Sequence, residues 1–244
     1  MLVDEQGTTV TARKFPRLVL VTPFRTEDGL RLTAPDRDPL SVSWPVDGAL
    51  INVNLWAEPF HAALASEEAS AWFSNVIGAP VRLVYLDDPT RRRTNPARSR
   101  PDDRVSLADA YPLLLATEES LTALNAWVAE GPRAAEGPVP MTRFRPNLVV
   151  SGAPAWAEDT WRGVRIGDVT FRAVKACDRC AFTLVDPDTA RRTKEPLLSL
   201  ARHRQWGHKT WFAVNLIPDQ PVGILRLGDR LQVLKRAEDD EPQR

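Results

Sequence analysis

Short segments of the β type dominate the hydrophobic pattern of the chain. Most of them alternate apolar and polar residues or are brief apolar runs, and Pro, Gly and Asp end them. This pattern predicts strands within residues 17–21, 29–34, 40–44, 81–86, 111–116, 147–150, 164–175, 181–185, 211–217, 223–226 and 230–234. Because strands and helices do not alternate regularly, we expect a mainly β fold of the barrel type, with a few helices (α+β), rather than a doubly wound sheet.

Three segments have features of helices. Residues 66–77 carry one apolar stripe, start at Ser66 as a candidate N-cap and are followed by Gly78, a residue that favours a helix end. Thr117 is a candidate N-cap for a second helix, and residues 195–205 predict a third.

Charge and composition limit the possible partners. Acidic and basic residues balance at 32 each, so no overall field favours nucleic acid or an anionic membrane. The sequence also lacks an apolar stretch of membrane-spanning length and a secretory pattern at its start. We therefore expect a cytoplasmic protein with no nucleic-acid or membrane partner, in which a local cluster binds any anionic ligand.

Composition changes sharply over residues 87–104, which are polar and rich in Pro and Arg. We interpret this stretch as a mobile loop or linker. It would separate an N-terminal β domain over residues 1–86 from a β-barrel domain over residues 105–236, and residues 237–244 would form a disordered tail.

The only two cysteines, Cys177 and Cys180, form a Cys-x-x-Cys segment that allows several interpretations. It could be a redox pair, half of a zinc site completed by His203 and His208, two small buried thiols, or one metal ligand beside a bystander. A predicted strand follows the segment, which disfavours a thioredoxin-like pair. The neighbouring Arg179 would help to keep a Cys180 thiolate charged, and a thiolate is a good ligand for a soft metal.

A second group of polar residues lies at the start of the strand predicted near residue 147. Alternation would place Arg143, Arg145 and Asn147 on one face of that strand. Two guanidinium groups can hold a phosphate or an oxoanion, and an amide can pair with the edge of a heterocycle. A solvated strand end is the alternative.

Several motifs occur together in an order and spacing that resembles the MOSC family, the molybdenum-cofactor sulfurase C-terminal domains. Within this family, the chain looks like the bacterial relatives of the mitochondrial amidoxime reducing component. The motifs are Arg143-Phe-Arg-Pro-Asn-Leu-Val-Val, Trp161-x-x-x-x-Ile-Gly-Asp, Cys177-Asp-Arg-Cys180-x-x-Thr-x-Val-Asp-Pro-Asp, Glu195-Pro-Leu, Phe212-x-Val-Asn-Leu and Leu227-Gly-Asp.

This resemblance implies a MOSC-type β-barrel preceded by a smaller β domain. It implies that Cys180 ligates molybdenum and that Arg145 and Asn147 line the pterin of the molybdenum–molybdopterin cofactor (Moco). Thr117, the hydroxyl residue that opens the second predicted helix, is a further implied cofactor contact. We add Arg143 and Arg179 as cofactor-binding residues because of their expected positions.

The start of the chain departs from the family pattern. The usual Pro-x-Lys-Ser strand and Gly-Asp-Arg-Arg segment, whose lysine and arginine bind the cofactor phosphate in the family, are missing. We therefore expect either that the start of the gene is placed too late, or that this form has an incomplete first domain and binds the cofactor weakly.

By resemblance, the expected function is a molybdenum-dependent oxidoreductase that reduces N-hydroxylated or N-oxide small molecules. Two cysteines are too few for a ferredoxin-type cluster, so a separate reductase would supply the electrons. The alternatives are a non-catalytic carrier of the cofactor or of sulfur, and a β protein that binds nothing.

Overall fold

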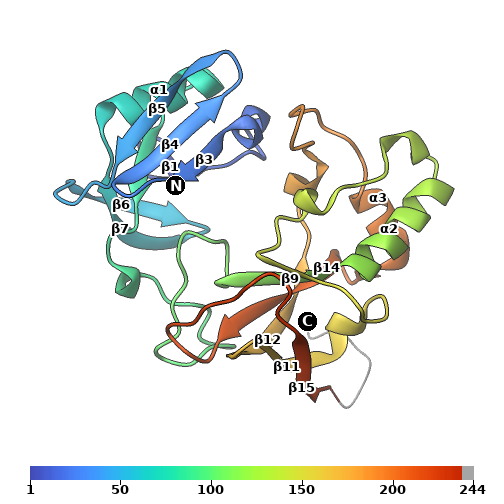
Figure 1. The fold of residues 1–244 in the computed structure, drawn as a ribbon. Coiled ribbons are helices and arrows are strands. Elements are labelled where there is room, and N and C mark those ends of the chain that lie inside the picture. The colour runs from blue at the N-terminus through green and yellow to red at the C-terminus, as the bar shows by residue number, and fades with distance from the viewer. Residues whose placement is uncertain (238–244) are drawn as a thin grey trace. The chain divides into compact units, whose positions relative to one another are not determined.

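The computed structural model describes residues 1–237 (Figure 1). The chain folds into two compact units. The first unit consists of Met1–Arg93, Arg104–Asp109 and Val185–Arg192, and the second of Thr94–Asp103, Ala110–Leu184 and Thr193–Arg244. The predicted domain boundaries at residues 86 and 104 remain predictions. The predicted tail, apart from residue 237, lies outside the described residues.

The first unit contains two antiparallel sheets and one α-helix within the described residues. One sheet has the strand order β2-β1-β8-β7-β6 and the other β3-β4-β5. Their elements are β1 (Leu2–Val3), β2 (Thr9–Val10), β3 (Thr22–Arg25), β4 (Gly29–Ala34), β5 (Arg37–Ser43), β6 (Leu50–Leu55), β7 (Glu58–Leu64), α1 (Glu67–Ile77) and β8 (Arg82–Tyr85), with the 3-10 helices η1 (Pro16–Leu20) and η2 (Pro89–Arg91).

Helix α1 begins and ends as predicted. The Ser66 hydroxyl accepts a hydrogen bond from the Ala69 backbone nitrogen at 3.2 Å, and Gly78 ends the helix in the left-handed conformation. Ala69, Phe73 and Val76 form its buried face. The helix thereby covers one of the two apolar clusters of this unit.

The second unit is built on a seven-stranded sheet, counted over the described residues, with the order β10-β9-β14-β12-β11-β15 and β13 paired to β14. Among the strand pairs of this sheet within residues 1–237, only β9–β10 is parallel. The strands of the second unit are β9 (Leu113–Thr117), β10 (Leu148–Val150), β11 (Trp161–Ile166), β12 (Val169–Asp178), β13 (Gln205–Trp206), β14 (Lys209–Pro218) and β15 (Leu231–Arg236). Its helices are α2 (Glu118–Glu130), α3 (Leu197–His203) and the 3-10 helices η3 (Ala134–Glu136), η4 (Met141–Arg143), η5 (Ala157–Thr160) and η6 (Ala181–Leu184).

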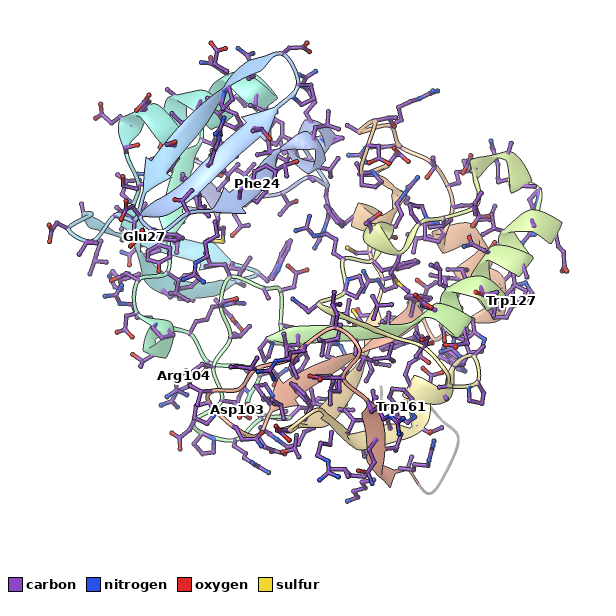
Figure 2. The ribbon with its side chains drawn as sticks, in the orientation of Figure 1. Phe24, Glu27, Asp103, Arg104, Trp127 and Trp161 are labelled. Carbon is purple, nitrogen blue, oxygen red and sulfur yellow. The ribbon has the colours of Figure 1, made fainter. Side chains whose placement is uncertain are left out.

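Two large apolar clusters and a small third one, formed by Tyr111, Val174 and Ile217, stabilise this unit within the described residues. Trp161, at the start of β11, is buried in the first, on the sheet (Figure 2). The second lies between the sheet and the helices α2 and α3, which lie side by side (Figure 1). Phe144 and Phe212 stack at its centre with their ring centroids 3.9 Å apart. The mainly β fold class with three α-helices, all within residues 1–237, is confirmed.

Three strand predictions are wrong. Residues 17–20 lie in η1, where Pro16 occupies the first turn and suits a helical start. Residues 181–184 form η6, and residues 223–226 form no strand. The pattern also missed the β6–β7 hairpin, because its turn uses Trp56 and Ala57 at positive φ, without the usual glycine.

The arginine-rich stretch predicted as a mobile linker makes specific contacts in each unit. The buried Arg92 donates to the carbonyl oxygens of Ser106, Ala108 and Asp109 in the first unit. Asp103 forms an ion pair with Arg172 in the second unit at 2.7 Å. Mobility of the remaining residues stays a prediction. Within residues 1–237, no helix has both the length and the apolar character needed to cross a bilayer.

Candidate functional site

Cys180 lies in the second unit, between the end of β12 and the start of η6. Its thiol is free and its side chain is half-buried, as is that of Cys177 near the end of β12. The Cys180 carbonyl accepts hydrogen bonds from the Thr183 backbone nitrogen at 3.1 Å and from the Thr183 hydroxyl at 3.0 Å. These local bonds explain why η6 replaces the predicted strand.

Arg143 fixes the segment that carries Cys180. Its side chain is buried, and Nη1 donates to the Thr183 carbonyl at 3.2 Å and to the Thr193 hydroxyl at 3.0 Å. The guanidinium thereby joins η4 to η6. Arg143 was predicted on an open strand face, and this is wrong because residues 141–143 form a 3-10 helix.

Arg145 and Asn147 have different surroundings from each other. Arg145 is exposed, adopts the left-handed conformation with φ 52°, and its guanidinium carbon lies 5.6 Å from the centre of the Phe182 ring. Asn147 is also exposed, and its Oδ1 accepts from the Leu114 backbone nitrogen at 2.9 Å. The strand β10 begins only at Leu148, so the predicted common strand face of Arg143, Arg145 and Asn147 does not exist. Through Phe182, however, the fold does bring Arg145 next to the Cys180 segment.

The side chain of Arg179 contacts Cys177. Its Nη1 lies 2.9 Å from Cys177 Sγ, and its Nη2 donates to the Phe144 carbonyl at 2.9 Å. Burial raises the pKa of the Cys177 thiol, although the charge of Arg179 acts in the opposite direction. This arginine therefore joins the Cys-x-x-Cys segment to the loop at Phe144, a positioning role that the sequence did not indicate.

Thr117 lies in a different group of polar residues. Its hydroxyl is buried, accepts from the Ser120 backbone nitrogen at 3.1 Å as the N-cap of α2, and lies 3.3 Å from Glu158 Oε2. Ser120 donates to the same carboxylate at 2.9 Å. A cofactor contact of Thr117 remains a prediction, and these contacts give the residue a structural role instead.

Sequence reasoning missed Glu158. Its carboxyl group is buried, and burial raises its pKa to about 7. The residue lies in a short mixed segment, Ala-Trp-Ala-Glu-Asp, and no periodicity there indicates a buried acid. Only the fold, through η5 and the first turn of α2, brings Glu158 to Thr117 and Ser120.

The positions of the possible metal ligands limit which kind of metal site the protein can form. Within residues 1–237, no three histidine, cysteine or acidic side chains gather as ligands for one ion, so the zinc alternative with His203 and His208 lacks its ligand set. Cys180 can serve as a single soft ligand, and the exposed Arg145 is a neighbouring cation that can bind an anionic part of a larger ligand.

Comparison with known proteins connects this arrangement to a family. The MOSC domain matches residues 102–232, and the MOSC N-terminal beta barrel domain matches residues 1–80. The mitochondrial amidoxime-reducing component 1 of Homo sapiens is 32% identical over 249 residues, which cover 96% of this chain and 72% of the relative.

Two further relatives have similar identity and coverage. The corresponding protein of Mus musculus is 34% identical over 249 residues, which cover 96% of this chain and 71% of the relative. The mitochondrial amidoxime reducing component 2 of Macaca fascicularis is 34% identical over 243 residues, which cover 94% of this chain and 70% of the relative. The family resemblance predicted from the motifs is confirmed, and the chain belongs to the MOSC-domain family, with the MOSC N-terminal β-barrel domain preceding its MOSC domain.

Proposed function

We propose that this protein binds the molybdenum–molybdopterin cofactor through Cys180 and reduces N-hydroxylated or N-oxide small molecules. The names of the relatives, amidoxime-reducing components, support this class of substrate. The observation that carries the proposal is the position of a free, half-buried thiol beside the segment of Arg145 in the MOSC domain.

The residues present fit such a cofactor. A thiolate is a ligand suited to a soft metal, and Cys180 is held in a segment that the hydrogen bonds of Arg143 fix. Arg145 presents an exposed guanidinium and Asn147 an exposed amide, and both groups can donate hydrogen bonds to the pterin. Arg143 and Arg179 donate to backbone carbonyls, so we assign them to positioning rather than to direct contact.

The proposed reaction removes one oxygen from the substrate. The N–O bond breaks, two electrons and two protons are consumed, and the oxygen leaves as water. When bound, the cofactor would supply the electron pair, while the protein provides the ligand, the orientation and the charged surroundings. We assign the supply of electrons to a separate reductase, because the two cysteines of the given sequence, Cys177 and Cys180, cannot hold an iron–sulfur cluster.

A turnover experiment tests this function. Protein purified from a molybdenum-replete host is mixed without oxygen with benzamidoxime and reduced methyl viologen, and benzamidine formation is measured. We expect turnover by the wild type and by Cys177→Ser, and its loss in Cys180→Ser. A wild-type protein that contains molybdenum and forms no benzamidine would contradict the reductase and favour the cofactor carrier.

A further inference from the structure

Phe182 is an aromatic residue two positions after Cys180, on the 3-10 helix η6. The Cα atoms of the two residues are therefore no more than about 7.6 Å apart. Phe182 is half-buried, whereas the other phenylalanines of the second unit, Phe144, Phe171 and Phe212, are buried. The fold thus leaves one phenylalanine of this unit partly accessible, on the segment that carries the proposed metal ligand.

The backbone of η6 holds Phe182 in a fixed turn. The Cys180 carbonyl accepts hydrogen bonds from the Thr183 backbone nitrogen at 3.1 Å and from the Thr183 hydroxyl at 3.0 Å. The Thr183 carbonyl in turn accepts from the buried Arg143 at 3.2 Å. Thr183 itself is buried, and neighbouring residues of a 3-10 helix direct their side chains to different sides. A ring on such a fixed turn loses little freedom when a ligand binds.

Arg145 covers one face of the Phe182 ring. Its guanidinium carbon lies over the ring, 5.6 Å from the ring centre, a distance typical of a cation–π contact. Arg145 is exposed and its backbone is left-handed, with φ 52°, a conformation that non-glycine residues often adopt at ligand sites. Because Arg145 is a proposed cofactor contact, the Phe182 ring lies at the edge of the proposed cofactor site, where a substrate would approach.

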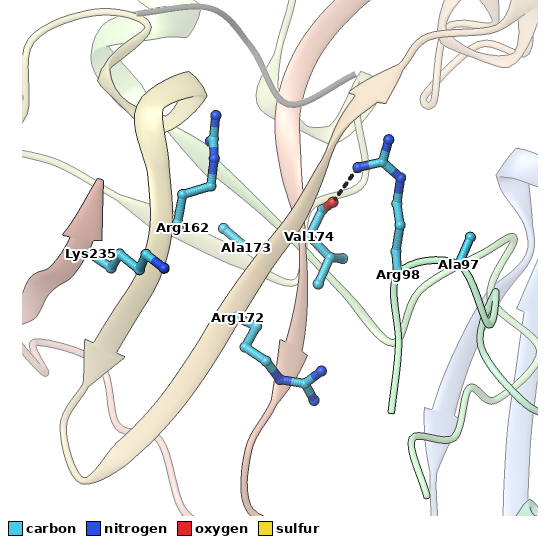
Figure 3. Close-up of a pocket in the computed structure, with 7 residues that line it drawn as sticks. All are labelled: Ala97, Arg98, Arg162, Arg172, Ala173, Val174 and Lys235. Carbon is cyan, nitrogen blue, oxygen red and sulfur yellow. Dashed lines mark hydrogen bonds between the residues drawn. The ribbon is translucent and has the colours of Figure 1, made fainter. Parts of the chain in front are cut away.

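A hollow elsewhere in the second unit has a different lining. It consists of arginine, lysine, alanine and valine side chains, and Arg98 Nη1 donates to the Val174 carbonyl there at 3.1 Å (Figure 3). None of the described residues that line this hollow is aromatic, and none is a cysteine. An aromatic substrate whose N–O bond must reach Cys180 is therefore better placed at Phe182.

We propose that Phe182 contacts the aromatic ring of the substrate, so that the protein prefers aryl amidoximes and aryl N-oxides to aliphatic ones. This inference rests on the proposed function and names a narrower substrate class for the same site. Two aromatic rings attract each other in offset or edge-to-face arrangements beyond the burial of their surfaces. An aliphatic substrate lacks this attraction, and small-molecule sites commonly combine aromatic side chains with a few polar groups such as Arg145.

A comparison of two amidoximes tests the proposal. Molybdenum-containing protein receives reduced methyl viologen and either benzamidoxime or acetamidoxime, and kcat/KM is measured for each. We expect Phe182→Leu to lower the ratio of the benzamidoxime value to the acetamidoxime value about fivefold, because it removes the ring and keeps an apolar side chain. Incomplete loading with molybdenum changes both values equally, so the ratio reports specificity alone.

Two further variants serve as controls. Phe182→Tyr keeps the aromatic ring and should keep the ratio of the wild type. Phe24→Leu makes the same substitution at an exposed phenylalanine of β3, in the first unit, and should also leave the ratio unchanged. Circular dichroism verifies that each variant is folded, and Phe182→Met takes the place of Phe182→Leu if the latter unfolds.

Binding without turnover provides a second readout. Fluorine NMR measures the dissociation constant of 4-fluorobenzamidoxime without an electron donor, so no reduction occurs. We expect this constant to be about fivefold larger for Phe182→Leu than for the wild type and Phe182→Tyr. An unchanged ratio or an unchanged dissociation constant in Phe182→Leu would overturn the inference. A molybdenum-containing wild type that reduces neither amidoxime would contradict the proposed function instead, and the dissociation constants would then decide the role of Phe182.

Discussion

Nη1 of Arg143 lies 3.2 Å from the carbonyl oxygen of Thr183, and this hydrogen bond joins η4 to the 3-10 helix that follows Cys180. The same nitrogen lies 3.0 Å from the Thr193 hydroxyl. A buried guanidinium with these partners determines the course of the Cys180 segment before any ligand is present. The position of the thiol therefore depends on an arginine that is not itself available to a ligand.

The first prediction concerns this buried arginine. Arg143→Ala should lower the free energy of unfolding by about 3 kcal/mol, because it removes buried hydrogen bonds and leaves a cavity. Arg145→Gln is the control, because Arg145 is exposed and its substitution should change stability by no more than about 0.5 kcal/mol. Urea unfolding of both proteins without cofactor measures the difference. Equal stability of the two variants would show that Arg143 does not fix the segment.

Local signals predicted several elements correctly. The caps at Ser66 and Thr117 and the helix end at Gly78 are satisfied within one turn, so the sequence alone reveals them. The two-residue loop of the β11–β12 hairpin is Gly167-Asp168, and only Gly167 has positive φ, which a type II′ turn requires at its first central position.

The predicted geometry of the site was wrong, and the roles of its residues remain predictions. The prediction placed Arg143 and Arg145 on one face by strand alternation. Instead, Arg143 ends the 3-10 helix η4, and the backbone of Arg145 adopts the left-handed conformation. Tertiary hydrogen bonds, from Arg143 to Thr183 and from Arg179 to Phe144, determine that loop. Such bonds join residues about 40 and 35 positions apart, and no local pattern encodes them.

A second prediction separates the structural role of Thr117 from a cofactor contact. Thr117→Val should destabilise the cofactor-free protein by about 2 kcal/mol, because α2 loses its N-cap and Glu158 loses a hydroxyl partner. Thr117→Ser keeps the hydroxyl and should retain most of the stability. The midpoint of thermal or urea unfolding measures both. If Thr117→Val unfolds like the wild type, the residue has no structural role and the cofactor contact gains support.

The third prediction concerns pH. Burial raises the pKa of Glu158 from its ordinary value of 4.5 to about 7. Since the folded state then holds the proton more tightly than the unfolded state, the protonated acid stabilises the fold fully below pH 4.5. This contribution is lost as the pH rises through about 7, and the loss should reach about 3 kcal/mol.

Glu158→Gln provides the comparison for this prediction. An amide keeps the shape and the acceptor for Ser120 but does not titrate, so the variant should lack the stability loss between pH 4.5 and 7. Urea unfolding across this pH range measures both proteins. Parallel stability profiles of the wild type and Glu158→Gln would exclude a raised pKa at this position.

The last prediction concerns the two cysteines, which are a matched pair three residues apart. Cys180→Ser should abolish metal loading, because a hydroxyl is a poor ligand for a soft metal, while Cys177→Ser should retain it. Both variants keep the number of side-chain atoms and should remain folded. Circular dichroism verifies this before the metal is measured.

The most direct test of Cys180 as the metal ligand is the molybdenum content per chain. Inductively coupled plasma mass spectrometry measures it for the wild type, Cys177→Ser and Cys180→Ser, all produced in the same molybdenum-replete host. We expect molybdenum in the first two proteins and its loss in the third. Equal molybdenum in Cys180→Ser and the wild type would contradict the assignment of this thiol as the metal ligand.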